Sequence, residues 1–507
     1  ELHIPSIDLR KFKSDDRLVD VIPERLARQH RFVPLSMMGD TLTVALVDPL
    51  NIAAIDDIRD ITGKNVDVVM GSPVQIEEAI SRLYGTPQEG SVADVSKTID
   101  VGDFEIISEG KAAAPDAEVG DQAPVIRMVN LIIKEALRQR ASDIHLDPSE
   151  KDMRVRYRVD GVLEDVLEIP RESRGAVVVR IKIMSRLDIT TTQTPQDGRF
   201  KMRLGAKEVD FRVSILPTSH GPKVVMRILD RSNLSVGLAH LGFSPRSIQI
   251  LDEAIQRPFG MLLVTGPTGS GKSTTLYSIV NQLNSVDRNI ITVEDPVEYL
   301  VEGVTQIEVR SDIGLSFASS LRSILRQSPD VVMVGEIRDN ETADIAIKAS
   351  LTGQLVLSTL HTNDAAGAVT RLVDMDVEPF LVASSLILVC AQRLCRKICP
   401  HCKEPVDIPE EALRRFQGKV PPGTKLYAGR GCDRCRQTGY LGRFGVTEIL
   451  LLDDGIRELL LEGRSADDIK EYAVKNQGMR TLWDDAIDHL TEGLTTFEEV
   501  LRVAAED

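Results

Sequence analysis

GPTGSGKST, Gly266 to Thr274, decides the fold of this 507-residue chain. It follows the apolar run MLLVT, residues 261–265, which suits a buried parallel strand, and it leads into a segment with apolar residues on one helical face. Glycines in such a loop let backbone N–H groups converge on phosphate oxygens at the positive end of a helix. The stretch therefore predicts a strand, loop and helix that bind a nucleotide phosphate.

The residue types in this loop indicate what its members do. By the logic of the motif, Lys272 reaches the β and γ phosphates, and the Ser273 hydroxyl ligates Mg²⁺. The alternative, a glycine-rich turn that only joins a strand to a helix, is disfavoured by the flanking segments. The residues expected to contact the nucleotide are Gly266, Pro267, Thr268, Gly269, Ser270, Gly271, Lys272, Ser273 and Thr274.

Three further apolar runs end in polar residues that suit hydrolysis. Glu336 follows VVMVG, Glu294 and Glu298 lie in TVEDPVE, and His361 follows LVLSTL. Ligands of open α/β sheets bind at the carboxyl ends of the strands, so these side chains are expected near the phosphates. We assign Glu336 to Mg²⁺ and transition-state organisation, with Glu294 or Glu298 as the alternative for orienting the attacking water. Alone each has an ordinary structural explanation; together they indicate an ATPase.

Length, charge and hydropathy limit the class of protein. At about 150 residues per domain, the chain has room for roughly three domains. The formal net charge of −16 disfavours a nucleic-acid motor, because sequence-independent binding depends on Lys and Arg neutralising phosphates. No run approaches the roughly 18 uninterrupted apolar residues that a membrane-spanning helix needs. A soluble chain is expected, with any membrane role through a partner.

Composition divides the chain into four parts. Residues 1–85 alternate short apolar strands with helix-like segments and predict a small α/β domain. Residues 86–120 are rich in Gly, Ala, Ser, Asp and Glu, which predicts a flexible linker. Residues 121–238 predict a second α/β domain that begins with a helix over roughly 123–138. From 239 to 507, strands and helices alternate as in a parallel sheet with crossover helices.

Four cysteines within residues 395–445 form two C-x2-C pairs, Cys399 with Cys402 and Cys432 with Cys435. Two such knuckles suit tetrahedral Zn²⁺ bound by four thiolates. The segment between them is irregular and proline-rich, so the metal is expected to hold it together. A redox role is disfavoured because no thioredoxin-like context surrounds either pair.

Other segments of the last domain carry structural expectations. The apolar stretch around Cys390 is expected to be a helix with this cysteine in the core. Residues 446–507 are expected to form a helical C-terminal part. Cys395 and His401 lie outside the preferred zinc tetrad, although either could substitute for a ligand.

Four boxes in this order resemble the secretion ATPases, the superfamily of type II secretion, type IV pilus assembly and pilus retraction motors. GPTGSGKSTTLYS, TVEDPVEY, LRSILRQSPDVVMVGEIRD and STLHTNDAAGAVTRL are similar to its Walker A motif, aspartate box, Walker B motif and histidine box. VEDPVEY and AAGAVTRLVD look closest to the type II secretion ATPases of the general secretion pathway protein E family. Two departures are Gln354, where a histidine is usual, and Ser328, where an aspartate is usual.

The resemblance implies a fold and a reaction. The fold is α/β: a RecA-like P-loop ATPase core, a preceding PAS-like α/β domain, a small N-terminal α/β adaptor domain and a zinc-binding subdomain. The reaction is hydrolysis of ATP with Mg²⁺, which drives pseudopilus assembly and protein export in a type II secretion system. A type IV pilus assembly (extension) ATPase is the alternative, and a DNA-uptake or conjugation motor is a less favoured one.

The resemblance also implies partners and further site residues. It implies a cytoplasmic homo-hexamer, peripherally associated with the inner membrane. Residues 1–85 would bind the cytoplasmic domain of an inner-membrane platform protein, and a polytopic platform protein would be a second partner. No nucleic acid is expected. Five arginines match family positions that neutralise charge on the transferred phosphoryl group: Arg212, Arg227, Arg322, Arg326 and Arg443.

A further alternative concerns the N-terminal domain. Some relatives use this domain to sense a cyclic dinucleotide, which would make the chain a nucleotide-controlled binding module. The long motif that those relatives use is not found in residues 1–85.

Overall fold

A computed structural model describes the chain as two compact units, residues 1–99 and 100–507. The described residues are 32–39, 41–47 and 64–84 with a few isolated positions in the first unit, and 104–107, 123–204, 207–229, 237–407, 416, 419–420 and 424–504 in the second. Most of the linker expected at 86–120 therefore lies outside the described residues.

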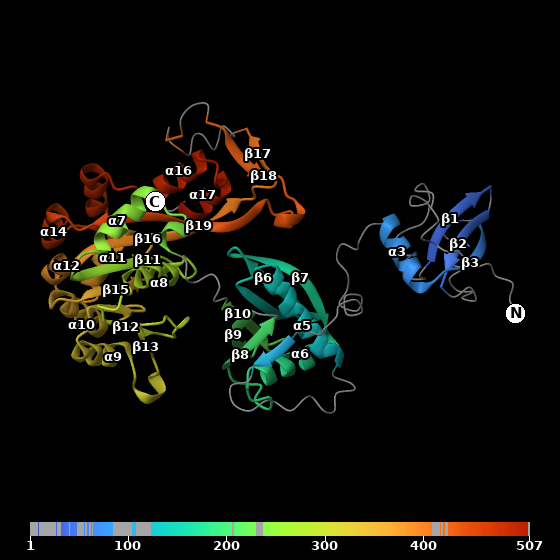
Figure 1. Cartoon of the computed structure of the whole chain (residues 1–507), viewed down its shortest axis with the longest axis horizontal. Coiled ribbons are helices and arrows are strands. Elements are labelled where there is room, and N and C mark those ends of the chain that lie inside the picture. The colour runs from blue at the N-terminus through green and yellow to red at the C-terminus, as the bar shows by residue number, and fades with distance from the viewer. Residues whose placement is uncertain are drawn as a thin grey trace. The chain divides into compact units, whose positions relative to one another are not determined.

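The first unit is a small α/β structure (Figure 1). Strands β1 (Phe32–Met38) and β2 (Thr41–Leu46) pair antiparallel, and β3 (Asn65–Met70) pairs parallel with β2. Helix α3 (Pro73–Tyr84) follows β3. Alternation along the strands directs one set of apolar side chains towards this helix. The cluster that they form includes Val33, Leu35, Ala45, Ile76 and Ile80.

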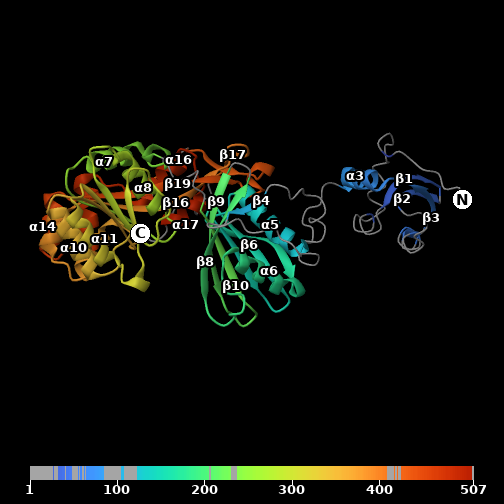
Figure 2. The ribbon, with the colours of Figure 1, turned by 60° about the horizontal axis from the view of Figure 1, so that its bottom comes forward.

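The second unit begins with an antiparallel sheet that two helices cover. Helix α5 (Ala123–Arg138) has the bounds that its helical spacing of apolar residues predicts, and α6 (Arg171–Met184) packs beside it (Figures 1 and 2). The Tyr157 hydroxyl ties the sheet to α5 by donating to the Ile132 carbonyl at 2.6 Å. In spatial order the strands are β4 (Phe104–Ile107), β8 (Gln196–Leu204), β9 (Lys207–Leu216), β10 (Lys223–Leu229), β5 (Asp143–Pro148), β6 (Asp152–Val159) and β7 (Val162–Pro170).

A second seven-stranded sheet follows within residues 260–451. In spatial order its strands are β13 (Thr305–Glu308), β12 (Ile290–Glu294), β14 (Val331–Val334), β15 (Leu355–Leu360), β11 (Gly260–Thr265), β16 (Leu386–Ile398) and β19 (Tyr440–Leu451). Alternate residues of β11 enter different cores: Met261 and Leu263 join one, whereas Leu262 and Val264 join the other. Both faces of the sheet are therefore covered, as parallel sheets require.

Helices cover the two faces of this sheet. Side chains of α7 (Pro245–Ile255) and α8 (Lys272–Leu283) pack on one face. On the other face pack α9 (Phe317–Ile324), α10 (Asn340–Leu351) and α11 (Ala365–Asp374). The remaining helices follow from residue 379 onward: α12 (Pro379–Ser385), α14 (Asp454–Leu461), α15 (Ala466–Tyr472), α16 (Leu482–Thr491) and α17 (Phe497–Ala504).

Two expectations for this region are wrong in detail. Cys390 is completely buried, as expected, but it lies in strand β16 rather than in a helix. The sheet is also not wholly parallel, because β19 pairs antiparallel with β16. A short apolar run has no periodicity that separates a buried strand from a buried helix, and the partner of β16 lies about fifty residues farther along the chain.

Candidate functional site

The phosphate-binding loop joins β11 to α8, as its sequence predicts. Gly266, Gly269 and Gly271 have φ values of 145°, 82° and 91°, a region that favours glycine. A Cβ atom at Gly266 would lie 2.5 Å from the Gln392 carbonyl oxygen, and one at Gly271 would lie 2.7 Å from Gln392 Nε2. The loop therefore needs glycine for its backbone conformation and for its close approach to β16.

Gln392 holds this loop from the neighbouring strand. Its Nε2 donates to the Ser270 carbonyl at 2.9 Å, and its Oε1 accepts from the Thr275 hydroxyl at 2.8 Å. Gln392 is buried, so both ends of its amide are satisfied within the protein. The sequence gives no signal for this contact, because a glutamine in an apolar strand has no motif around it.

Lys272 begins α8 with its side chain turned into the loop. Its ammonium donates to the Gly266 and Pro267 carbonyls at 2.7 and 3.1 Å. Burial lowers the pKa of Lys272 to about 8, against the opposing charge of Glu336. Both hydrogen bonds of this ammonium go to neutral carbonyls, so a phosphate group would supply a negatively charged acceptor. Ser273 and Thr274 lie in the same first turn and are at least partly exposed.

Glu336, Arg338 and His361 form a charged cluster beyond the ends of β14 and β15. The Glu336 carboxylate forms an ion pair with Arg338 and lies 3.1 Å from His361 Nε2. Burial opposes ionisation, but the Arg338 guanidinium and the His361 ring together hold the pKa of Glu336 below its usual value. Arg338 also lies 3.6 Å from the Asp295 carboxylate. Sequence reasoning missed Arg338, although its position two residues after Glu336 is a usable signal.

The structure places Glu294 in a different environment from Glu336. Glu294 is buried at the end of β12, where its carboxylate accepts from Thr292 Oγ1 at 2.6 Å, from Gln306 Nε2 at 3.2 Å and from the Tyr277 hydroxyl. Burial and the adjacent Glu294 charge raise the pKa of Tyr277, so the phenol stays a donor. These bonds fix the Glu294 carboxylate within the protein.

Glu298 lies in the segment after β12 and contacts a side chain from the antiparallel sheet. Arg212, on β9, lies 3.0 Å from the Glu298 carboxylate and donates to the Val297 carbonyl at 3.2 Å. The antiparallel domain thus delivers a guanidinium to the TVEDPVE segment within one chain.

The other four arginines have different partners among the described residues. Arg227 pairs with Asp143 at 3.0 Å, Arg443 lies 3.6 Å from Asp160, and Arg322 pairs with Glu341. Arg326 donates to the Arg322 carbonyl at 2.9 Å and to Ser323 Oγ at 3.1 Å. Their proposed action on a phosphoryl group therefore needs a neighbouring subunit or a rearranged chain.

The four cysteines converge as their spacing predicts. Their Sγ atoms all lie within 4.8 Å of one another, with 3.8 Å between Cys399 and Cys432 and 3.7 Å between Cys402 and Cys435. Zn–S bonds of about 2.3 Å in a tetrahedron place the sulfurs about 3.8 Å apart, so the cluster fits Zn²⁺. Although burial acts in the opposite direction, backbone N–H groups of Cys432 and Gly439 hold the pKa of Cys435 below its usual value. Metal would join β16 and β19 to the segment with strands β17 (Lys403–Val406) and β18 (Leu426–Gly429).

Zinc removal is expected to loosen this segment. Protein purified without any chelator should contain one zinc ion per chain, and the Cys432→Ser variant should contain well under half of that amount. Metal analysis with thermal unfolding measures both effects, and His401→Ala is the matched control because His401 is exposed and contacts Arg434 instead. Equal zinc in the Cys432 and parent proteins would contradict the tetrad.

Comparisons with known proteins identify one protein family. The family model for "type II/IV secretion system protein" matches residues 118–502, and the MshEN domain model matches residues 2–90. The type IV pilus assembly ATPase PilB of Myxococcus xanthus is 48% identical, over 99% of this chain and 89% of its own length. The type II secretion system protein E of Pseudomonas aeruginosa is 47% identical, over 90% and 91% respectively.

A solved structure shares the fold at lower identity. The Legionella pneumophila ATPase DotB is 21% identical, with a TM-score of 0.57 over 78% of this chain and 98% of its own. This similarity shows the fold alone, and it agrees with a RecA-like core. The described helices include none with the length and apolar character needed to span a bilayer.

Proposed function

Because the chain belongs to the type II/IV secretion system protein family, we propose that it is the motor ATPase that drives pseudopilus assembly in a type II secretion system. The chain is an ATP-hydrolysing enzyme, as its relatives' names state of them. One observation carries the hydrolytic part of the proposal: the glycine loop follows β11, and the Glu336–Arg338–His361 cluster follows the adjacent strands β14 and β15 of the same sheet. The Glu336 carboxylate raises the pKa of Lys272, against the larger lowering by burial.

The side chains have distinct tasks in this proposal. Lys272 leaves its carbonyl partners for the β and γ phosphates, and the loop amides surround the remaining oxygens. Ser273 and Glu336 would hold Mg²⁺, which neutralises charge between the phosphates when bound. His361 and Arg338 keep the Glu336 carboxylate ionised and oriented. Glu298 or Glu294 is the alternative for orienting the attacking water. The Glu298 side chain is 32% exposed, whereas Glu294 is buried and its carboxylate is held by three donors.

Arginines complete the site in the proposed homo-hexamer. Charge builds on the transferred phosphoryl group, and a guanidinium can bind its oxygens bidentately. Arg212 already lies beside the TVEDPVE segment, whereas Arg227, Arg322, Arg326 and Arg443 would act at the interface between subunits. Arg227 suits this task because its side chain is 56% exposed despite its pairing with Asp143.

The proposed partners lie at the inner membrane. We assign residues 1–85 to binding the cytoplasmic domain of an inner-membrane platform protein, with a polytopic platform protein as the second contact. The chain would then be cytoplasmic and peripherally associated with that membrane. Support comes from the adaptor-like N-terminal unit and from relatives named as secretion and pilus proteins.

The choice between secretion and pilus assembly needs a test in the host. Deletion of the gene is expected to block release of type II substrates while surface pili and twitching persist, and the intact gene should restore release. Relatives of both names match at nearly equal identity, so a type IV pilus assembly ATPase is the second candidate. Loss of pili with normal secretion would contradict the secretion proposal and support the pilus assembly function instead.

A further inference from the structure

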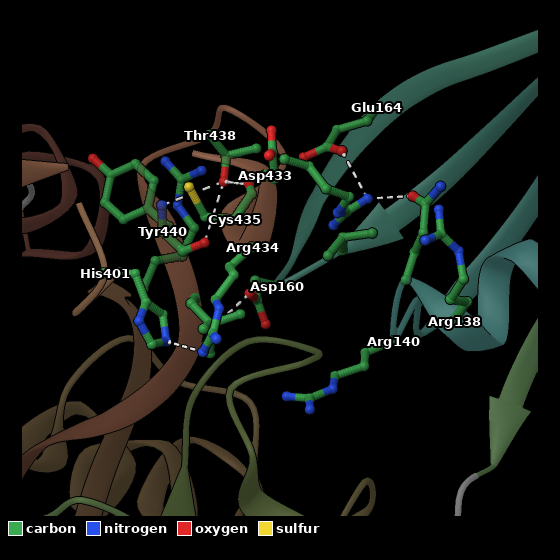
Figure 3. A pocket seen from close by; sticks show the side chains of 16 residues that line it. Arg138, Arg140, Asp160, Glu164, His401, Asp433, Arg434, Cys435, Thr438 and Tyr440 are labelled. Carbon is green, nitrogen blue, oxygen red and sulfur yellow. Dashed lines mark hydrogen bonds and ion pairs between the residues drawn. The ribbon is translucent and has the colours of Figure 1, made fainter. Parts of the chain in front are cut away.

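A cavity of about 500 Å³ lies apart from the phosphate-binding loop, where the antiparallel domain meets the cysteine knuckles. Figure 3 shows its lining: the turn after α5, the β6–β7 turn, and the loops on either side of Cys435. Small-molecule sites have volumes of about 300 to 1,000 Å³. No residue of the 266–274 loop lines this cavity, so it is not part of the nucleotide site.

The charge of the lining is unbalanced. Five arginines line the cavity against three carboxylates, Asp160, Glu164 and Asp433. Asp160 accepts from the Gly442 N–H at 3.0 Å and lies 3.6 Å from Arg443, and Glu164 lies 3.6 Å from Arg436. Asp433 accepts from Gln437 Nε2 at 3.5 Å, so all three acidic groups already have positive or N–H partners.

Three of the five guanidinium groups have carboxylate partners: Arg138 pairs with Glu135, Arg396 with Glu499 and Arg436 with Glu164. Among the described residues, the other two lining arginines, Arg140 and Arg434, have none. The Arg434 guanidinium contacts His401 Nε2 at 3.0 Å, and the Arg140 guanidinium forms no hydrogen bond or ion pair with any described residue. Arg140 comes from the end of α5 and Arg434 from the cysteine knuckle, so the two reach the cavity from different domains. Guanidinium groups that line a cavity without a carboxylate partner are suited to bidentate recognition of phosphate oxygens.

Backbone conformation gives independent support. Seven described non-glycine residues have positive φ, and three of them, Arg140, Asp160 and Arg436, line this cavity. Arg140, at φ 55°, follows α5 where glycine is the favoured residue. Unfavourable backbone conformations gather at functional sites, where the side chain is needed despite their cost.

We propose that this cavity binds a small soluble anion with two or more phosphate groups, held between Arg140 and Arg434. The ligand would join the antiparallel domain to the cysteine knuckle through charge-assisted hydrogen bonds. Such bonds are the kind for which arginine is better suited than lysine, and the cavity lining contains no lysine.

Arg140→Gly offers a clean test, because glycine relieves the backbone cost while it removes the guanidinium. Tripolyphosphate is titrated by calorimetry into full-length Lys272→Ala protein, in which the loop site is weakened and hydrolysis does not interfere. Saturable binding is expected, and Arg140→Gly or Arg434→Gln should weaken it at least about tenfold, as loss of one charged hydrogen bond predicts.

Arg186→Gly is the matched control. Arg186 has φ 57° and follows α6, and it does not line the cavity, so the same replacement should change the affinity less than about twofold. The melting temperature of Arg140→Gly should not fall below that of its parent. Absence of saturable binding, or equal affinities for Arg140→Gly and Arg186→Gly, would overturn the proposal. Neither result depends on the motor function.

Discussion

Lys272→Ala is expected to abolish ATP hydrolysis, with turnover reduced at least about 100-fold, as for loss of one preorganised charge-stabilising group. In the structure its ammonium is buried and bound to two loop carbonyls, with a pKa lowered to about 8. Alanine leaves the loop without the charge that meets the β and γ phosphates. Steady-state phosphate release at saturating ATP measures the loss.

A second lysine provides the control for this substitution. Lys348 lies on the exposed side of α10 and pairs with Asp344 at 2.6 Å, so Lys348→Ala should keep nearly full turnover. In the host, the Lys272 variant should also stop export. Continued export by protein that cannot hydrolyse ATP would refute the motor proposal while leaving the ATPase assignment untouched.

Glu336→Gln should be nearly as damaging. The substitution keeps the shape of the side chain but removes the charge that Arg338 and His361 hold in place and that is proposed to bind Mg²⁺. Single-turnover hydrolysis is expected to slow by about 100-fold or more, the lower range for loss of an acid–base or charge-stabilising group. Nucleotide binding should survive, because the loop amides and Lys272 remain.

Three glutamine variants separate the possible roles. Glu404→Gln, on exposed β17, is the matched control and should behave as the parent. Glu298→Gln should slow hydrolysis only if this residue orients the water. Glu294→Gln should also lower the melting temperature, because the buried carboxylate accepts from three donors. A fully active Glu336→Gln enzyme would remove Glu336 from the proposed site.

Local patterns predicted much of this arrangement. The loop between β11 and α8 and the position of helix α5 follow from residues close together in sequence, and the four cysteines converge as two closely spaced pairs. Glycine spacing, helical periodicity and paired knuckles report such short-range geometry directly. The roles of individual glutamates and arginines remain predictions, since they depend on bound nucleotide and on neighbouring subunits.

These local patterns could not predict contacts between residues that are far apart in the sequence. Strand β16 and its antiparallel partner β19 are separated by the cysteine segment, and the helix expected around Cys390 was wrong for that reason. Gln392 and Ser270 are 122 positions apart in the sequence, and no motif around either residue predicts their contact. The ion pair between Arg338 and Glu336 depends on the direction of the Arg338 side chain, which the sequence does not specify.

Strand β16 has a consequence for the transmission of force. Gln392 grips the phosphate-binding loop near the middle of this strand, and the first zinc-ligand candidate, Cys399, follows its last residue. Seven residues at about 3.3 Å each span roughly 23 Å of a rod braced by β19 along most of its length. The pairing is irregular between Arg396 and Ile398, directly before the knuckle, where a strand bends. A displacement of the loop during a nucleotide cycle would therefore reach the cysteine knuckle through a hydrogen-bonded strand that can bend near its end.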